Sequence, residues 1–325
     1  MSIRATAAAP ALDQWIKSLD KAALDAPWTQ PGPLIKPKKS AMQAKVWRWR
    51  EIEALLRRSP EFMQPGRGAE RRILRLDNPG VPERTAAHTI SVAVQYLLPG
   101  EVAPAHRHTP NAIRFMLHGE GAFTTIEGDK FVMRRGDLVV TPSMSWHDHG
   151  NDGSAPVIWT DGLDSPVVRY LENLFGEEFE GDAQPVRTGP AARHLHYRWD
   201  VAYAELMSRA KGEADPFDDV IMEYVDPASG GSVVPAIGCY LQMLRPGVTT
   251  RAHRQTSSAV YHVVSGSGFT DIHGVRYDWG EGDFFAIPPR AAHAHGNLGS
   301  EAAILYSLQD VPMLRALGFY RAEAA

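Results

Sequence analysis

Residues 97–151 read LLPGEVAPAHRHTPNAIRFMLHGEGAFTTIEGDKFVMRRGDLVVTPSMSWHDHGN, and the stretch returns at residues 243–297 as MLRPGVTTRAHRQTSSAVYHVVSGSGFTDIHGVRYDWGEGDFFAIPPRAAHAHGN. Glycines, prolines and histidines recur at an offset of 147 residues, which falls to 146 after a single deletion. His106 thus matches His253, and His147 matches His293. Self-similarity over this length predicts that the chain contains one domain twice.

Each copy consists of short apolar segments, such as SVAVQYLL, AIRFML and DLVVTP, separated by glycine-containing turns. This pattern is typical of an antiparallel barrel or sandwich. In AIRFMLH the period of two puts Ile113, Phe115 and Leu117 on one face of a strand and leaves Arg114 with Met116 on the other. Residue 114 is therefore a charged group on an otherwise apolar strand.

Helical patterns lie outside the two copies, in LDQWIKSLDKAAL, VWRWREIEALLRR, VVRYLENLFGEEF and WDVAYAELMSRAK. The last two flank a stretch with Pro and Gly at residues 181–193, which we expect to be the inter-domain linker. The predicted organisation is an N-terminal helical extension with the start of the barrel packing (residues 1–85), a first domain (86–180), and a linker, helix and second domain (181–325).

The composition is that of an ordinary soluble globular enzyme, with 44% hydrophobic and 22% charged residues in 325. A net charge of -4, from 34 Lys and Arg against 38 Asp and Glu, argues against a nucleic acid or an anionic membrane as partner. No run approaches the roughly 18 apolar residues of a membrane span. The single cysteine, Cys239, favours a reducing compartment, and we expect the protein to be cytoplasmic.

Histidines in the first copy have the spacing of metal ligands. His106 and His108 are two residues apart, so a strand presents both imidazoles on one side. A third ligand must come from another strand, and about 40 residues later WHDHGN offers His147 and His149, again on one face. Three nitrogen ligands would leave coordination positions open, which is typical of catalytic metal sites.

These spacings resemble the two cupin motifs. Gly100 with His106-x-His108 is similar to the first motif, and Gly136, Pro142, His147 and Asn151 are similar to the second. The resemblance implies an all-β fold, a bicupin of two double-stranded β-helix (jelly-roll) barrels with flanking α-helices. It also implies that His147 is the third ligand, because in that family the second motif's histidine joins the His-x-His pair on one metal.

Most cupins carry a glutamate ligand four or five residues after the second histidine, where this chain has Ala112 and Ile113. Neutral imidazoles leave the charge of a divalent metal uncompensated, so the site should favour an anionic chelating ligand. Nitrogen ligation with open positions suits Fe(II), Zn, Cu or Ni, and the ligands alone do not choose among them.

More of the chain resembles one cupin branch. HRHT followed by RF, the string WHDHGN and the sequel VIWTDGLDSPVVRYLENLF are similar to the bicupin ring-cleaving dioxygenases that act on gentisate, salicylate and 1-hydroxy-2-naphthoate, and WRW and ERRILRLDNPG are similar too. The resemblance implies one Fe(II) per chain in the first cupin, O2 as co-substrate and cleavage between the carboxyl- and hydroxyl-bearing carbons. Gentisate, giving maleylpyruvate, is the first expectation, and a homotetramer is the implied assembly.

The same resemblance assigns roles to individual residues. Arg114 is expected to hold the substrate carboxylate or an oxygen-derived anion, and His149 to hydrogen-bond the substrate and move protons. Asp161 is expected to approach the hydroxyl opposite the carboxylate. Gln95 corresponds to a pocket-lining position, and Ser91 stands where some family members carry a tryptophan, which would open that wall.

The second copy differs at two of the chemically important positions. Gln255 stands where His108 repeats, and Tyr261 where Arg114 repeats, which favours a structural cupin. Two other functions stay open: a bicupin decarboxylase or isomerase using Mn or Zn, which usually retains the missing glutamate, and a small-molecule binder without catalysis. Metal content and oxygen consumption would distinguish them.

Overall fold

The structure is a computed structural model, and it describes residues 9–29, 39–66, 71–189, 191 and 194–325. It divides into two compact units, Met1–Ser40 and Ala41–Ala325. In the first unit, helix α1 spans Ala9–Lys21, and the rings of Trp15 and Trp28 lie 5.5 Å apart. The second unit contains both copies of the repeat.

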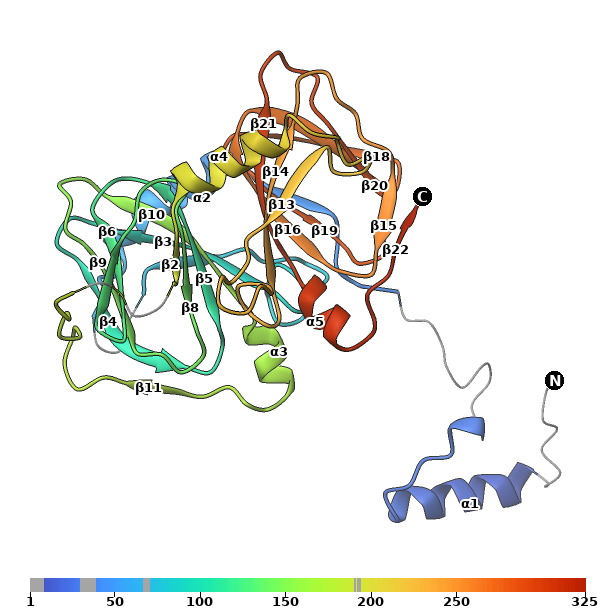
Figure 1. Ribbon diagram of the computed structural model, residues 1–325. Helices are drawn as coiled ribbons and strands as arrows, with labels where there is room; N and C mark the ends of the chain where they lie inside the picture. The colour runs from blue at the N-terminus through green and yellow to red at the C-terminus, as the bar shows by residue number, and fades with distance from the viewer. Residues whose placement is uncertain (1–8, 30–38, 67–70, 190, 192–193) are drawn as a thin grey trace. The chain divides into compact units, whose positions relative to one another are not determined.

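The first copy forms a barrel of two facing antiparallel sheets, drawn mainly in cyan and green in Figure 1. One sheet has the strand order β12 (His196–Tyr197), β8 (Leu138–Thr141), β5 (Ala112–His118), β10 (Val157–Leu163), β3 (Ser91–Leu97) and β2 (Ile73–Arg75). The other has the order β11 (Gly176–Glu178), β4 (Val102–His108), β9 (His147–Asn151), β6 (Ala122–Ile126) and β7 (Asp129–Val132).

The second copy repeats this barrel. One sheet has the order β1 (Lys45–Trp47), β19 (Phe284–Ile287), β16 (Ala259–Ser265), β21 (Ala303–Gln309), β14 (Gly238–Leu244) and β13 (Val220–Glu223). The other has the order β18 (Val275–Gly280), β17 (Ser267–Ile272), β20 (His293–Gly296), β15 (His253–Gln255) and β22 (Ala322–Ala324). The expected all-β architecture of two repeated barrels is confirmed.

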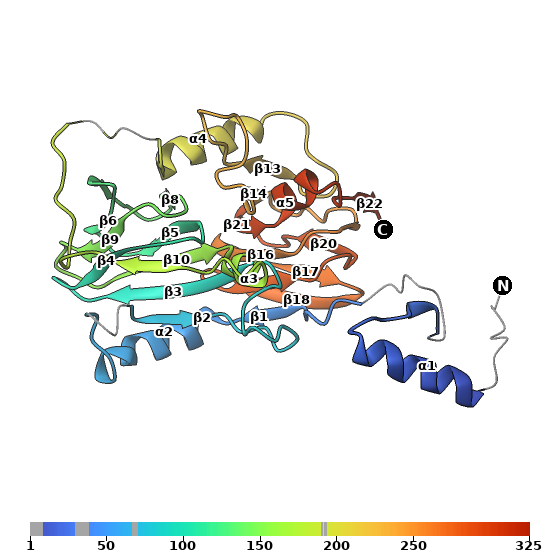
Figure 2. The same ribbon diagram turned by 90° about the horizontal axis from the view of Figure 1, so that it is seen from below.

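The largest hydrophobic core lies between the two barrels, which are side by side in both views (Figures 1 and 2). The two faces of β5 lie in different environments, one between the barrels and one inside the first barrel. Ile113, Phe115 and Leu117 belong to the core between the barrels, whereas Met116 belongs to the cluster inside the first barrel. The alternation predicted from AIRFMLH is therefore confirmed, and Arg114 shares the inward face with Met116.

Helices flank the barrels: α2 (Trp49–Arg58), α3 (Ser165–Tyr170), α4 (Trp199–Arg209) and α5 (Val311–Ala316). The backbone N–H of Trp49 donates to Asp283 of the second barrel over 2.8 Å, and that of Trp199 donates to Asp137 of the first over 2.8 Å. Gly282 has φ +86°, and a Cβ there would lie 2.5 Å from the Trp49 ring. The tryptophans before each barrel are thus packing anchors.

The segment VVRYLENLFGEEF was expected to be helical throughout, and that expectation is wrong. The helix ends at Tyr170, and residues 176–178 form β11 instead. The reason lies in the tertiary structure, because the backbone of this segment pairs with the exposed edge of β4.

Part of the predicted linker, residues 190, 192 and 193, lies outside the described residues. Within the linker, the backbone N–H of Gln184 donates to the Asp148 carboxylate of the first barrel over 2.9 Å. In the described part of the chain, no helix has the length and apolar character needed to cross a membrane.

A cavity of about 270 Å³ between the barrels is lined by His262, which repeats Phe115. Burial is the main cause that lowers the pKa of His262 to about 3, and the nearby Arg135 and His118 contribute to the same shift. Below the ordinary histidine pKa of about 6.5, His262 therefore binds a proton in the unfolded chain but stays neutral in the folded chain. The free energy of unfolding should fall by about 1.4 kcal/mol per pH unit from this residue as the pH drops from 6.5 towards 3.

His262→Phe should flatten that slope when urea unfolding is followed at pH 7, 6, 5 and 4. The exposed His194 supplies the control, because His194→Gln should keep the slope of the unmodified chain. An unchanged slope in His262→Phe would show that His262 does not stay neutral in the folded protein.

Candidate metal centre and active site

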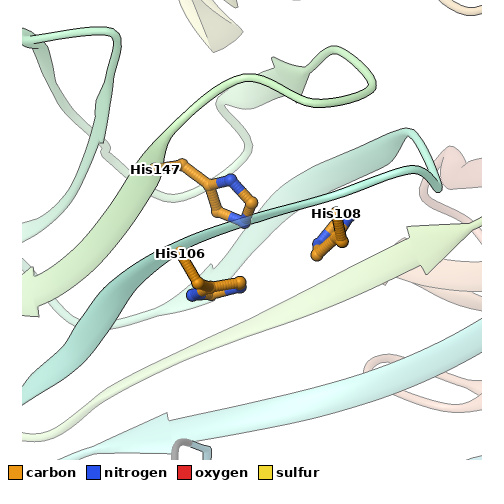
Figure 3. A group of neighbouring side chains, drawn as sticks. All are labelled: His106, His108 and His147. Carbon is orange, nitrogen blue, oxygen red and sulfur yellow. The ribbon is translucent and has the colours of Figure 1, made fainter. Parts of the chain in front are cut away.

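The first barrel brings three imidazoles to one point. His106 and His108 lie two residues apart on β4, and β9 pairs with β4 so that His147 stands directly opposite His106. One ring nitrogen from each histidine lies within 4.8 Å of the others, and Figure 3 shows the rings turned toward one another. The three ligand positions expected from the sequence therefore converge, and among the described residues no other group of His, Cys, Asp and Glu does so.

Backbone carbonyls orient each imidazole. The Nδ1–H groups of His106, His108 and His147 donate to carbonyl oxygens two residues away along the chain, each over 2.8 Å, at Pro104, Pro110 and Ser145. Because Nδ1 carries the proton, the Nε2 lone pair of every ring faces the shared point. This arrangement is what a metal requires of its histidine ligands.

The electrostatics keep these rings neutral. Burial lowers the pKa of His106 to about 3 and that of His108 to about 4, and it places the pKa of His147 well below its usual range. The nearby Arg71 guanidinium is the second cause in each case. Neutral imidazoles at neutral pH have their lone pairs free for a cation, so protons do not compete with a metal there.

A cationic group already lies against the triad. A guanidinium nitrogen of Arg71 contacts Nε2 of His106 and lies 3.2 Å from Nε2 of His147. The cluster therefore accepts positive charge at the point where the lone pairs meet, which is the behaviour expected of a metal site. Arg71 lies two residues before Ile73, which pairs with Gln95, so the period of two turns it toward the barrel interior.

Several buried polar atoms nearby have no hydrogen-bond partner among the described residues. They are Nε2 of His108 and His149, Nη2 of Arg114, and both amide atoms of Gln95. A barrel interior that buries this many unpaired polar atoms is suited to a polar ligand and a metal, because leaving such atoms unpaired costs about 1–3 kcal/mol each. The residues present therefore fit a metal with nitrogen ligands and open positions.

Arg114 and Asp161, predicted as separate contacts, form a pair. They stand opposite each other on β5 and β10, both are buried, and the Arg114 Nε lies 2.8 Å from the Asp161 carboxylate. Trp159 donates its indole N–H to the other Asp161 oxygen over 3.0 Å. Asp161 thus orients the arginine, and its expected contact with a ligand hydroxyl stays a prediction.

His149 shares the inward face of β9 with His147, and the two ring centroids are 5.4 Å apart. Its Nδ1 is 3.0 Å from the Thr124 hydroxyl, which in turn accepts from Arg114. Burial, with Arg114 as the second cause, holds the pKa of His149 well below its usual range. A neutral ring with Nε2 turned inward can exchange a hydrogen bond with a ligand.

The two residues expected on a pocket wall, Gln95 and Ser91, belong to β3. Leu97 belongs to the interior cluster of the first barrel, and the period of two puts Gln95 and Ser91 on the same face. Both are buried, and Ser91 pairs with Leu163, which lines a cavity of about 400 Å³ that reaches His106 and His108. The expected role of these two residues in shaping the pocket stays a prediction.

In the second barrel, the residues that repeat the three histidine positions make different contacts. Nε2 of His253 lies 2.8 Å from Nε2 of His293, and the Gln255 amide nitrogen lies 3.4 Å from the same His253 atom. The Gln255 amide oxygen accepts from the hydroxyls of Tyr320 and Ser257 over 3.0 and 3.1 Å. These side chains pair with one another rather than facing an open point.

An aromatic stack fills the inside of the second barrel. The rings of Tyr261 and Phe285 are 4.6 Å apart and those of Trp279 and Phe285 are 5.8 Å apart, all nearly parallel. Tyr261 repeats Arg114, and Phe285 repeats Val139. The space that the first barrel leaves around its arginine is therefore occupied in the second.

Comparison with known proteins agrees with this geometry. Residues 93–163 and 240–308 match the cupin domain family. The chain is 37% identical over 303 residues to the 5-aminosalicylate 1,2-dioxygenase of Comamonas sp, covering 86% of this chain and 81% of that protein. The chain belongs to the bicupin gentisate 1,2-dioxygenase family. A second member, the gentisate 1,2-dioxygenase of Ralstonia sp, is 35% identical over 300 residues, covering 86% of this chain and 84% of that one.

A solved member of this gentisate 1,2-dioxygenase family shows the same fold. The salicylate 1,2-dioxygenase of Pseudoaminobacter salicylatoxidans, in a crystal structure with gentisate, superposes with a TM-score of 0.89 at 30% identity, covering 100% of this chain and 96% of that one. The chain is accordingly an oxidoreductase of the gentisate 1,2-dioxygenase type with a histidine cluster suited to a metal.

Sequence reasoning missed the position of Arg71. The string ERRILRL was recognised as similar to this family, but not which of its arginines faces the histidines. Arg72 instead pairs with Glu101 over 2.7 Å on the other side. The alternation of the extended residues that lead into β2 could have separated the two, had the strand been located from the sequence.

Proposed function

We propose that the protein is an Fe(II)-dependent dioxygenase that inserts O2 between the carboxyl- and hydroxyl-bearing carbons of a hydroxylated aromatic acid. Gentisate, giving maleylpyruvate, is the first candidate, and salicylate and 1-hydroxy-2-naphthoate are alternatives. The observation that carries this proposal is the convergence of three oriented Nε2 lone pairs beside the buried Arg114. Relatives named for gentisate and 5-aminosalicylate support the substrate class.

His106, His108 and His147 would hold the iron, one per chain. When bound, Fe(II) supplies a centre that chelates the aromatic acid and activates O2. Because all three ligands are neutral, the protein leaves the charge of the iron to be balanced by the substrate, and a carboxylate with an ortho phenolate does this well. No carboxylate from positions 112 and 113 competes, since these are Ala112 and Ile113.

The remaining residues of the site would bind and orient the substrate. Arg114 directs its unpaired Nη2 to the substrate carboxylate, while Asp161 holds the guanidinium in place through Nε. His149 would donate or accept a hydrogen bond through Nε2 and exchange a proton with the substrate there. Arg71, which contacts Nε2 of His106, would have to move aside for iron to be held by the three nitrogens, and it lines the same cavity as His106 and His108.

The division of labour between the barrels is part of the proposal. The paired His253, His293 and Gln255 and the aromatic stack support a structural role for the second cupin, with catalysis confined to the first.

We propose that the protein is a homotetramer, for which the exposed Tyr170 and Phe175 are candidate contacts. Light scattering would measure the mass of this assembly. The buried thiol of Cys239 is compatible with the reducing cytoplasm, our proposed location.

The test is oxygen uptake by protein loaded anaerobically with Fe(II) and given gentisate, salicylate and 1-hydroxy-2-naphthoate in parallel. We expect uptake of one O2 per substrate and a new ultraviolet-absorbing, ring-opened product with at least one of them. Protein reloaded with Zn should consume no oxygen. If the iron-loaded protein binds metal but consumes no oxygen with any substrate, the dioxygenase proposal fails, and release of CO2 would then identify a decarboxylase.

A further inference from the structure

The hydroxyl of Thr124 lies between Arg114 and His149 inside the first barrel. Nη1 of Arg114 is 3.2 Å from the Thr124 Oγ1, and Nδ1 of His149 is 3.0 Å from the same oxygen. All three side chains are buried. Among the described residues these are the two hydrogen-bond partners of the hydroxyl, so its single hydrogen has to be placed between them.

The chemistry of the guanidinium decides where that hydrogen points. An arginine side chain has five N–H donors and no acceptor, so Arg114 can only donate to the Thr124 oxygen. The hydroxyl hydrogen is then donated to Nδ1 of His149, which accepts it. If Nδ1 carried a hydrogen instead, the Thr124 oxygen would accept from both neighbours, and its own hydrogen would be buried without an acceptor, which is unfavourable.

This assignment fixes the tautomer of His149. A neutral imidazole has one N–H group, so a ring that accepts at Nδ1 carries its hydrogen on Nε2. The ring stays neutral because a second positive charge next to the buried Arg114 guanidinium would be costly.

His147, on the same face of β9, has the opposite tautomer. Its Nδ1–H donates to the Ser145 carbonyl, so its Nε2 carries the lone pair. A metal binds a histidine nitrogen through a lone pair and not through an N–H group. The tautomers therefore give a physical reason why His147, and not His149, is suited to join the metal ligands.

The second barrel contains the same arrangement with a different donor. Nδ1 of His295 is 2.9 Å from the Thr270 Oγ1, and the Trp279 indole N–H donates to that oxygen over 3.0 Å. An indole nitrogen, like a guanidinium, can only donate. Thr270 and His295 repeat Thr124 and His149, although Tyr261 stands at the position of Arg114. In both barrels the threonine thus accepts from a group that cannot accept, and its hydrogen is left for the histidine.

We propose that Thr124 is a positioning residue that holds His149 in the tautomer with the hydrogen on Nε2, where the N–H group donates to an anionic oxygen of the bound ligand. Nε2 of His149 is buried and has no partner among the described residues, so its hydrogen is available to a ligand. The position of the hydrogen follows from the protein alone. Its use on a bound aromatic acid rests on the proposed function.

The first test is magic-angle-spinning NMR of the full chain labelled with ¹⁵N-histidine and loaded with Zn, which is diamagnetic. The spectrum distinguishes a protonated ring nitrogen from one with a lone pair, and His149→Gln identifies the signals of His149. We expect the hydrogen on Nε2 in the unmodified chain and in Thr124→Ser, which keeps the hydroxyl. Thr124→Val has the same shape without the hydroxyl, so His149 should become a mixture of both tautomers.

Thr270→Val is the matched control in the second barrel. It should change the signals of His295 and leave those of His149 as they are. The second readout is the dissociation constant of gentisate, measured without oxygen on the Fe(II)-loaded variants. Loss of the directed donor in Thr124→Val should raise this constant about tenfold, whereas Thr124→Ser and Thr270→Val should stay near the unmodified value.

The outcomes separate the inference from the proposed function. A hydrogen on Nδ1 of His149 in the unmodified chain would overturn the inference, and so would an unchanged His149 tautomer in Thr124→Val. An unchanged affinity for gentisate in a variant whose tautomer has changed would show that the ligand does not use the N–H group. If the tautomers behave as expected but the unmodified chain cleaves no aromatic acid, the proposed function fails and the assignment of Thr124 stands.

Discussion

Replacement of His147 by alanine is expected to abolish both iron binding and oxygen uptake. His147 supplies the ligand that joins β9 to the His-x-His pair on β4, and its ring is fully buried. With two imidazoles left, the site has too few ligands to hold Fe(II) against a chelator. Iron should fall from about one per chain to below about a tenth, and kcat/KM should fall by at least about 1,000-fold. Elemental analysis after gel filtration and an oxygen electrode measure the two effects.

His293 provides the matched control, since it repeats His147 in the second barrel. Its Nδ1–H donates to the Ala291 carbonyl over 2.9 Å, just as His147 donates to Ser145. His293→Ala removes an equivalent side chain from an equivalent strand and should keep its iron and activity. Loss of half of the iron in His293→Ala, or its retention in His147→Ala, would contradict the assignment of the metal to the first barrel.

Replacement of Arg114 by methionine is expected to have the second largest effect, on activity and stability together. Removal of the guanidinium leaves the Asp161 carboxylate buried without its cation, which costs about 3–5 kcal/mol in comparable buried pairs. The substrate carboxylate also loses its charged partner, so kcat/KM should fall by about 100- to 1,000-fold. Urea unfolding and oxygen uptake measure these changes separately.

A second variant distinguishes the catalytic loss from unfolding. Arg114→Met combined with Asp161→Asn removes both charges, and the amide oxygen can still accept the Trp159 indole N–H. Most of the lost stability should return, while activity stays low because the carboxylate clamp is missing. Recovery of activity in the double variant would show that Arg114 serves the fold and does not contact the substrate.

Much of the fold could be predicted because the sequence pattern of the barrel occurs twice in the chain. Alternation in AIRFMLH distinguished the two faces of β5 correctly, since strand geometry alone determines that neighbouring side chains point to opposite sides. The helix expected over VVRYLENLFGEEF was wrong in its second half. Local propensity does not reveal that an exposed strand edge elsewhere in the barrel offers backbone hydrogen bonds to residues 176–178.

The sequence by itself determined the repeat and the family, and it pointed to the three histidines that converge in the structure. Strand periodicity indicated the pair His106 and His108, and the resemblance to the cupin motifs selected His147. Only the tertiary structure decided that Arg114 and Asp161 form one pair and that Arg71 contacts the histidines. These relations join residues on different strands, and the register that brings two strands together depends on packing across the whole barrel rather than on the residues of either strand.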